Sequence, residues 1–179
     1  MSDRNGNTHL LRGVAAGAIG GLVAAWVMNG FIAGAMKVQE GMKSPEQKAT
    51  EESQQAAQPK DEEQSEDSTM KVADTVAWLV TGQHLSKQGK QKGGPIVHYA
   101  FGALMGALYG ALAELSETST VGAGTAFGTG LFIAADEIMV PALGLSKPPT
   151  QQPASDQLTH YAAHLVYGTT TEMVRRIAA

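Results

Sequence analysis

The stretch GVAAGAIGGLVAAWVMNGFIAGAM, residues 13–36, carries no charged side chain, and Asn29 is its only strongly polar residue. A helix of this length reaches about 36 Å at 1.5 Å per residue, enough to cross a hydrocarbon core about 30 Å thick. Soluble helices seldom lack charge over such a length, because one face must meet water. Residues 1–36 are therefore predicted to be an N-terminal segment followed by a first transmembrane helix.

Three more segments, at 94–113, 121–145 and 158–174, are also poor in charge. They predict an all-α integral membrane protein, a bundle of four transmembrane helices, with residues 93–179 as its three-helix membrane region. The mean hydropathy is slightly negative, because residues 37–92 hold 18 of the 30 charged side chains. A soluble bundle rich in glycine and alanine is the alternative.

The first apolar stretch has a second interpretation, as a secretion signal. Arg4 and Arg12 could form its basic region, and Ala33-Gly34-Ala35 resembles a cleavage site. The apolar run is, however, longer than the 7–15 residues typical of such a signal. We therefore expect an uncleaved membrane anchor.

Residues 37–92 form a polar insert between the first two apolar segments. Its part from 43 to 69 is dominated by Glu, Gln, Ser, Lys and Asp, a composition that favours disorder. A short amphipathic helix is expected at about 69–81, capped by Ser68 or Thr69 and ended by Gly82. Its apolar face comprises Val72, Val76, Leu79 and Val80, and Trp78 would suit a membrane surface. The basic run Lys87, Lys90 and Lys92 is interpreted as a solvated linker.

Glycines recur at intervals of four in three of the apolar segments. Four residues advance a helix by little more than one turn, so each series makes a smooth groove on one face. Such grooves let helix backbones approach closely in lipid. We therefore expect helix packing through Gly13, Gly17, Gly21, Gly102, Gly106, Gly110, Gly124 and Gly128.

Ionisable residues within the apolar segments converge on one depth if the helices run antiparallel. His98, His160, His164, Asp136 and Glu137 would then share a layer in the outer third of the membrane. Buried ionisable groups need partners or water. Three roles stay open: structural pairing, a proton- or cation-responsive site, and a metal site at His98, His160 and His164. His160 and His164 are four residues apart, a spacing that puts both on one helix face.

A second polar layer is expected at the other side of the membrane. Carboxylates one turn inside the boundary, beside guanidinium groups, are most simply ion pairs that orient the bundle. The candidates are Glu114, Glu172, Arg12, Arg175 and Arg176. Since no nucleophile and base share a depth, we expect no enzyme activity, and no cofactor apart from the metal alternative.

Composition narrows the set of partners. The net charge is −4, and basic residues form no stripe interleaved with aromatic ones, so we expect no nucleic acid partner. The chain has no cysteine, which excludes disulfides and thiolate metal sites. The expected partners are the lipid bilayer and either a second copy of the chain or another membrane protein.

Several short motifs carry a family resemblance. His98, Tyr109 and Ala113-Glu114 are followed by Pro141-Ala-Leu-Gly144-Leu145, Pro148-Pro149, His164-Leu-Val, Glu172 and Arg175-Arg176. This pattern resembles the YagU-like family of uncharacterised bacterial inner-membrane proteins. The chain departs from that family in its polar insert and in Asp136-Glu137. The resemblance implies an inner-membrane location, cytoplasmic Arg175-Arg176 and a connection with acid tolerance, but no biochemical activity.

Together these patterns predict a non-enzymatic membrane protein whose His/carboxylate layer responds to protons or cations. The first helix usually dominates orientation, so both termini are expected on the cytoplasmic side. The competing hypothesis is a structural or assembly subunit that packs on another membrane protein through its glycine faces. An intramembrane metal-binding protein is the third.

Overall fold

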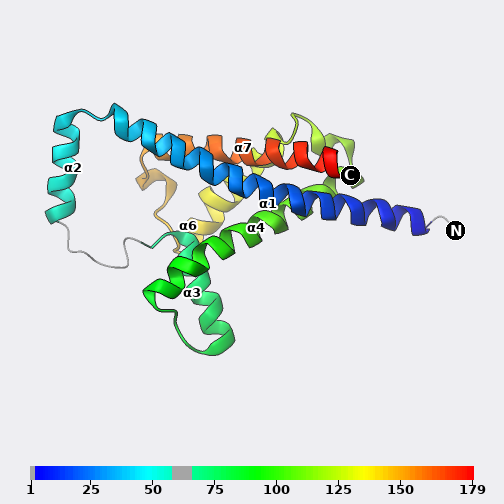
Figure 1. Cartoon of the computed structure of the whole chain (residues 1–179), viewed down its shortest axis with the longest axis horizontal. Helices are drawn as coiled ribbons and strands as arrows, with labels where there is room; N and C mark the ends of the chain where they lie inside the picture. Colours follow the sequence, from blue (N-terminus) through cyan, green and yellow to red (C-terminus); the bar gives the residue numbers. More distant parts are fainter. Residues whose placement is uncertain (1–2, 58–65) are drawn as a thin grey trace.

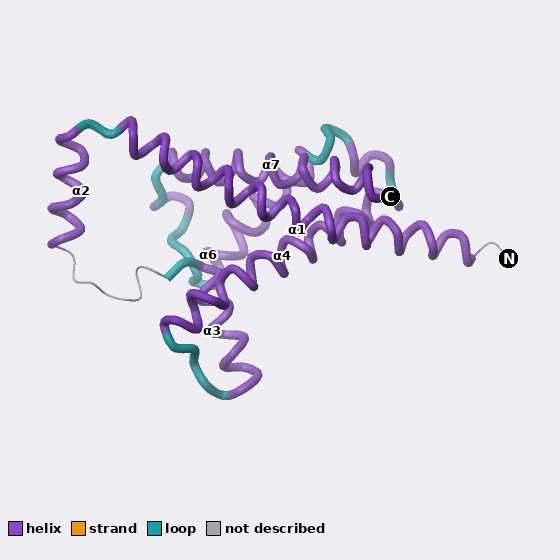
Figure 2. The backbone as a smooth tube through the Cα atoms, viewed as in Figure 1, coloured by secondary structure: helices purple, strands orange, loops and turns teal. Residues whose placement is uncertain are grey.

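The computed structural model describes residues 3–57 and 66–179, and within these ranges it is helical with no strand (Figures 1 and 2). Four long helical segments form the body of the protein. The elements in chain order are α1 (Asp3–Met42), α2 (Pro45–Ala57), α3 (Ser68–Thr81), α4 (Lys87–Leu115), η2 (Glu117–Thr120), α5 (Thr125–Leu131), η3 (Phe132–Met139), α6 (Val140–Ala142), η4 (Pro149–Gln151) and α7 (Ala154–Ala178).

Helix α1 lies along both α4 and α7 (Figure 1). Its buried residues Ala24, Ala25 and Met28 form one core cluster with Ala163 and Tyr167 of α7. The helix is 40 residues long, so it extends beyond the expected span of 13–36 at both ends. Its integration into the core makes α1 part of the fold of the described chain.

The glycines of α1 and α4 face one another along the crossing of the two helices. A Cβ atom added to Gly17 would meet the backbone of Gly106 and Gly110, and one added to Gly21 would meet that of Gly102 and Gly106. Only residues without side chains permit such a distance between helix axes. The α1–α4 seam, which we define as Gly13, Gly17, Gly21, Gly102, Gly106 and Gly110, is therefore a backbone-to-backbone contact.

A second glycine seam joins α5 to α7. A Cβ atom on Gly128 would collide with the carbonyl group of His164, and one on Gly124 with that of Gly168. Gly124 is not inside a helix, however: it caps the N-terminus of α5 with a φ of 89°. Gly124 and Gly128 were both expected inside a helix, but only Gly128 is helical, and Gly124 is the cap.

The third apolar segment is not one regular helix. Helix α5 begins at Thr125 rather than at Val121, because Gly122, Ala123 and Gly124 all have positive φ angles, which end a right-handed helix. The segment then widens into the π-helical turn η3 before the short α6. Asp136 and Glu137 lie within that π-helical turn, so the irregular backbone coincides with the charged residues.

Part of the polar insert is ordered, contrary to the expected disorder over 43–69. Residues Pro45–Ala57 form α2. Ser44 and Gln47 cap it reciprocally: the Ser44 hydroxyl accepts from the Gln47 amide, and the Gln47 side chain accepts from the Ser44 amide. Glu, Gln, Lys and Ala are good helix formers, which the composition argument neglected. The expected disorder over 58–65 lies outside the described residues.

Helix α3 occupies Ser68–Thr81, capped by Asp67 rather than by Ser68 or Thr69, and ends at Gly82 with a φ of 72°. It packs on α4 through Ala73. The basic run at 87–92 belongs to the first turns of α4 instead of a linker. Most of the apolar face of α3 is exposed, at Val76, Trp78, Leu79 and Val80.

Two helices of the described chain are long and apolar enough to cross a membrane, Thr8–Met42 and Lys87–Leu115. The two other segments expected to cross the membrane, 121–145 and 158–174, are not among these helices. The third is divided into three short elements by η3, and α7 carries Asp156, Glu172, Arg175 and Arg176.

Candidate functional site: a cavity lined by histidines and Asp136

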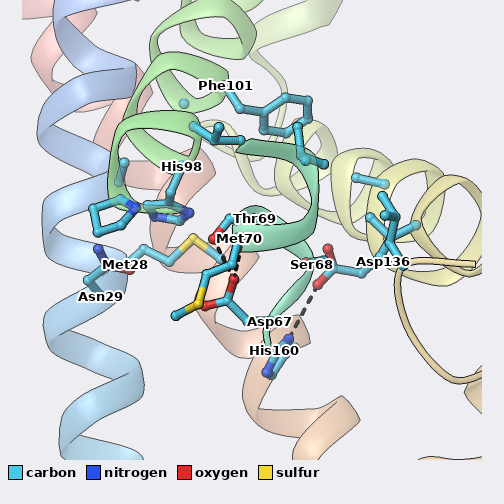
Figure 3. Close-up of a pocket in the computed structure, with 18 of the residues that line it drawn as sticks. Met28, Asn29, Asp67, Ser68, Thr69, Met70, His98, Phe101, Asp136 and His160 are labelled. Atoms are coloured by element: carbon cyan, nitrogen blue, oxygen red, sulfur yellow. Dashed lines mark hydrogen bonds and ion pairs between the residues drawn. The ribbon is translucent and has the colours of Figure 1, made fainter. Parts of the chain in front are cut away.

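A cavity of about 570 Å³ opens at the end of the bundle where α3 meets α4 (Figure 3). Its walls come from α1, α3, α4, the η3 region and α7. His98, His160, His164 and Asp136 all line it, whereas Glu137 does not. The structure therefore brings four of the five residues of the expected outer layer to one cavity.

Asp136 pairs with two histidines of α7. Its carboxylate lies 3.4 Å from His160 Nδ1 and 3.8 Å from His164 Nδ1, and Figure 3 shows the first contact as a dashed line. His164 Nδ1 also lies 2.9 Å from the carbonyl oxygen of His160. Because a carbonyl only accepts, His164 Nδ1 donates in this contact.

The two histidines of this pair differ in their surroundings. The His164 side chain is 7% exposed, whereas that of His160 is 53% exposed. The ring of Phe132 covers His164 with a centroid distance of 5.6 Å. His160 is therefore open to the surroundings of the protein, while His164 is held inside it.

His98 of α4 also lines the cavity, and in Figure 3 the first turn of α3 lies between His98 and Asp136. Its Nε2 atom is buried and has no hydrogen-bond partner within the described chain. A buried, unpaired polar atom costs about 1–3 kcal/mol. A partner from solvent or a ligand in the cavity would remove that cost.

Backbone irregularities occur on two walls of the cavity. Pro95 in α4 has no N–H group, so the carbonyl of Gln91 lacks its usual helical partner, and both residues line the cavity. On the other wall, η3 has the wide turns of a π-helix around Asp136. Single π-helical turns occur frequently at functional sites because they redirect side chains at a cost in stability.

The structure does not assemble the metal site considered from the sequence. Within residues 3–57 and 66–179, no three His, Asp or Glu side chains converge in a way that could hold a metal ion. His160 and His164 turn towards Asp136, and His98 makes its ring contact with Tyr99 instead. The i, i+4 spacing placed both rings of α7 against the same oxygen of Asp136, and His98 does not join them.

The expected ion-pair layer forms at the other end of the bundle. Glu172 is 1% exposed, and its carboxylate accepts from Arg175 Nε at 2.8 Å and from Arg176 Nε at 2.5 Å. Arg175 Nη1 also lies 3.5 Å from Glu114. Arg12 is exposed and makes none of the ion pairs that the described residues form. Four of the five candidates therefore meet.

Sequence reasoning missed the α3 wall of the cavity. Asp67, Thr69 and Met70 line it, and of these the sequence analysis had named only Thr69, as a possible helix cap. It also missed Tyr167, whose hydroxyl donates to the Gly102 carbonyl at 2.6 Å. The signal for Tyr167 was its position one turn from His164, since i, i+3 residues share a helix face.

The fold and the cavity define a helical protein with two helices suited to a membrane and a His/Asp site between its helices. A family described as "Protein of unknown function (DUF1440)" matches residues 81–173, more than half of the chain, and the chain belongs to this family. No curated protein and no solved structure matches it. The matched region contains all four ionisable cavity residues singled out above, but neither α1 nor most of α3.

Proposed function

We propose that this protein is a non-enzymatic, four-span protein of the bacterial inner membrane whose His/Asp cavity responds to protons. The proposal joins the helical fold and the cavity to the resemblance with the YagU-like family and its connection with acid tolerance. The observation that carries it is the pairing of Asp136 with His160 and His164 in a cavity near one end of the bundle.

The composition of α7 alone does not favour its insertion into a membrane, but the distribution of its polar residues does. Its buried residues include His164, Thr171 and Glu172, whereas Leu158 and Ile177 are 66% and 82% exposed. A soluble helix buries its apolar face and exposes its polar face. The inverted arrangement fits a lipid solvent, where polar groups must find partners inside the bundle.

Exposed apolar side chains also cover α1 and α4. Ile19, Leu22 and Trp26 of α1 and Leu104 of α4 are all exposed. Contiguous exposed apolar surface on a water-soluble monomer would favour aggregation. Contact with lipid chains gives these residues a favourable environment.

Proton response follows from the chemistry of the cavity. An ion pair between Asp136 and His160 or His164 exists only when the imidazole is protonated, and imidazole is the side chain whose unperturbed pKa, about 6.5, lies in the physiological range. The charged and titratable groups around the pair are Asp67 of α3, His98 of α4, Glu137 of η3 and Asp156 of α7. Acidification would add positive charge to a cavity that otherwise carries negative charge.

The alternative, an assembly subunit docking through its glycine faces, has less support. The α1–α4 seam engages its glycines within the chain, as does the contact between Gly128 and α7. These faces are therefore not free to receive a partner.

The topology is tested with single-cysteine variants. The chain has no native cysteine, so only the introduced residue reacts with a maleimide. A membrane-impermeant maleimide should label Ser116→Cys and Ala179→Cys from one side, and Gln83→Cys from the other. Labelling of all three from the same side would exclude four spans with the insert opposite the termini.

Proton response is tested with spin labels at Ile96 and Leu158, two exposed positions on α4 and α7 near the cavity. The distance between the labels should differ between about pH 5 and about pH 7.5. A double change of His160 and His164 to Gln should abolish that difference, whereas His9→Gln should preserve it. A pH-independent distance in the parent protein would rule out the proton-responsive function.

A further inference from the structure

The cavity combines negative charge with apolar and polarisable walls. Asp67 and Asp136 line it, and no Lys or Arg of the described residues does. Lys71 of α3 donates to the carbonyl of the lining residue Leu145 at 3.3 Å, so one ammonium group lies at the edge of the cavity, against two carboxylates that line it. Lys90 pairs with Glu66 at 3.1 Å. With its imidazoles neutral, the cavity therefore carries an excess of negative charge.

The remaining lining is suited to an apolar body. Three methionines, Met28, Met70 and Met139, line the cavity together with Phe101 and Tyr167. Thioethers adapt to irregular shapes and contact aromatic rings favourably, and aromatic faces attract cations. A volume of about 570 Å³ falls within the range that holds small organic ligands, roughly 300–1,000 Å³.

Two polar atoms of the cavity are available to such a ligand. The Asp136 carboxylate lies at 3.4 and 3.8 Å from its histidines, and these contacts are ionic only while a ring is protonated. His98 Nε2 is buried without a partner. The first turn of α3 lies between the two groups (Figure 3), so they offer separate polar contacts to a ligand in the cavity.

We propose that this cavity binds a small organic amine as its protonated cation, with the ammonium group on Asp136 and the apolar body among Met28, Met70 and Phe101. The proposal rests on the proton-responsive function and gives it a ligand class. Protons and the amine compete, because an imidazolium at His160 occupies the carboxylate that the ammonium group needs. Acidification would then release the bound cation.

Phenethylamine is a suitable probe, with 2-phenylethanol as its neutral counterpart of similar size. Binding of each to the purified protein in detergent is measured by calorimetric titration, with empty micelles subtracted. We expect phenethylamine to bind at least tenfold more tightly than 2-phenylethanol at about pH 7.5, and its affinity to fall roughly tenfold at about pH 5, as protons occupy the imidazoles.

Asp136→Asn tests the anchor, and Glu137→Gln is the matched control because Glu137 adjoins Asp136 in sequence but does not line the cavity. The first variant should lose the preference for phenethylamine over 2-phenylethanol while keeping the affinity for 2-phenylethanol. The second should leave both affinities unchanged.

Equal affinities of the two probes for the parent protein would overturn the proposal, and this comparison needs no variant. Binding of neither probe would overturn it as well. If the spin-label distance still changes with pH in that case, the proton-responsive function stands without an amine ligand. If the distance is also constant, both proposals fail.

Discussion

Replacing Gly106 by alanine tests whether the α1–α4 seam sets the distance between these helices. The added Cβ atom would lie 2.7 Å from Gly21 Cα and 2.8 Å from Gly21 N, and closer still to the Gly17 carbonyl oxygen. All three neighbours are backbone atoms, so no side chain can rotate away. Since ordinary contact begins at 3.4 Å, the helices must separate by about 0.7 Å or more at this point.

The cost of this separation follows from packing. A gap of roughly 0.5–1 Å forfeits a quarter to a half of the dispersion attraction between facing atoms, and overpacking costs about 1–3 kcal/mol in a close-packed core. Alanine is a better helix former than glycine by about 1 kcal/mol, which offsets part of that cost. Gly106→Ala alone should therefore change the free energy of unfolding only slightly, so a second glycine-to-alanine variant is needed for comparison.

Gly34→Ala supplies the reference. Gly34 is also helical and has no atom within 4 Å of an added Cβ, so this variant gains helix propensity without a clash. The free energy of unfolding should be about 1–3 kcal/mol lower for Gly106→Ala than for Gly34→Ala. Thermal unfolding of both variants in one detergent, followed by far-UV circular dichroism, measures the difference. Equal midpoints would show that the seam does not set the helix distance.

Three further predictions concern single contacts. The amide of Leu85 donates to Asp74 at 2.6 Å and, with His84 and Lys90, holds the pKa of Asp74 below its usual value of about 3.9. The contact between Asp74 of α3 and Leu85 should therefore persist above about pH 4 and weaken as the pH falls through the lowered pKa. Trp78 fluorescence should report that loss in the parent protein but not in Asp74→Asn. Glu172→Gln should cost about 3 kcal/mol in chemical unfolding, because it leaves the mostly buried Arg175 guanidinium with only the 3.5 Å contact to Glu114 as an ion pair; a cost below about 1 kcal/mol would mean that the ion pair with Glu172 is not structural. Tyr167→Phe should cost about 1 kcal/mol in the same assay, because it removes the hydrogen bond from the tyrosine hydroxyl to the Gly102 carbonyl, and an unchanged stability would exclude that hydrogen bond.

The helical class and the glycine faces of α1 and α4 could be predicted from sequence because both follow from periodic patterns. Gly13, Gly17 and Gly21 mark one face whatever helix they meet, and Gly102, Gly106 and Gly110 mark another. The sequence did not show that these two faces meet each other, because that pairing depends on how the helices are arranged in space.

The π-helical turn could not be predicted, because no simple residue pattern distinguishes it from an α-helix. The flanking helix α5 packs on α7, and such tertiary contacts are not written in the local sequence. The helix α2 was missed for the opposite reason. Its local signals, Ser44 and Gln47 as a capping box, were present but were outweighed by an argument from overall composition.

The sequence predicted that four residues of the candidate site lie close together, but not how they pair. Counting 1.5 Å per residue placed His98, His160, His164 and Asp136 at one level. It could not show that the Asp136 carboxylate faces α7 while His98 lies on another wall. That distinction depends on helix rotation, which the sequence does not fix when several faces are apolar.

The two glycine seams have a mechanical consequence. They fix α1 against α4 and α5 against α7, and the core cluster of Ala24, Ala25, Met28, Ala163 and Tyr167 joins α1 to α7. The helices are therefore held together along their length, and not only at the ion pairs of Glu172. Met28 and Tyr167 of that cluster also line the cavity. Part of the cavity wall is therefore preorganised by the core, so a ligand would not have to order it on binding.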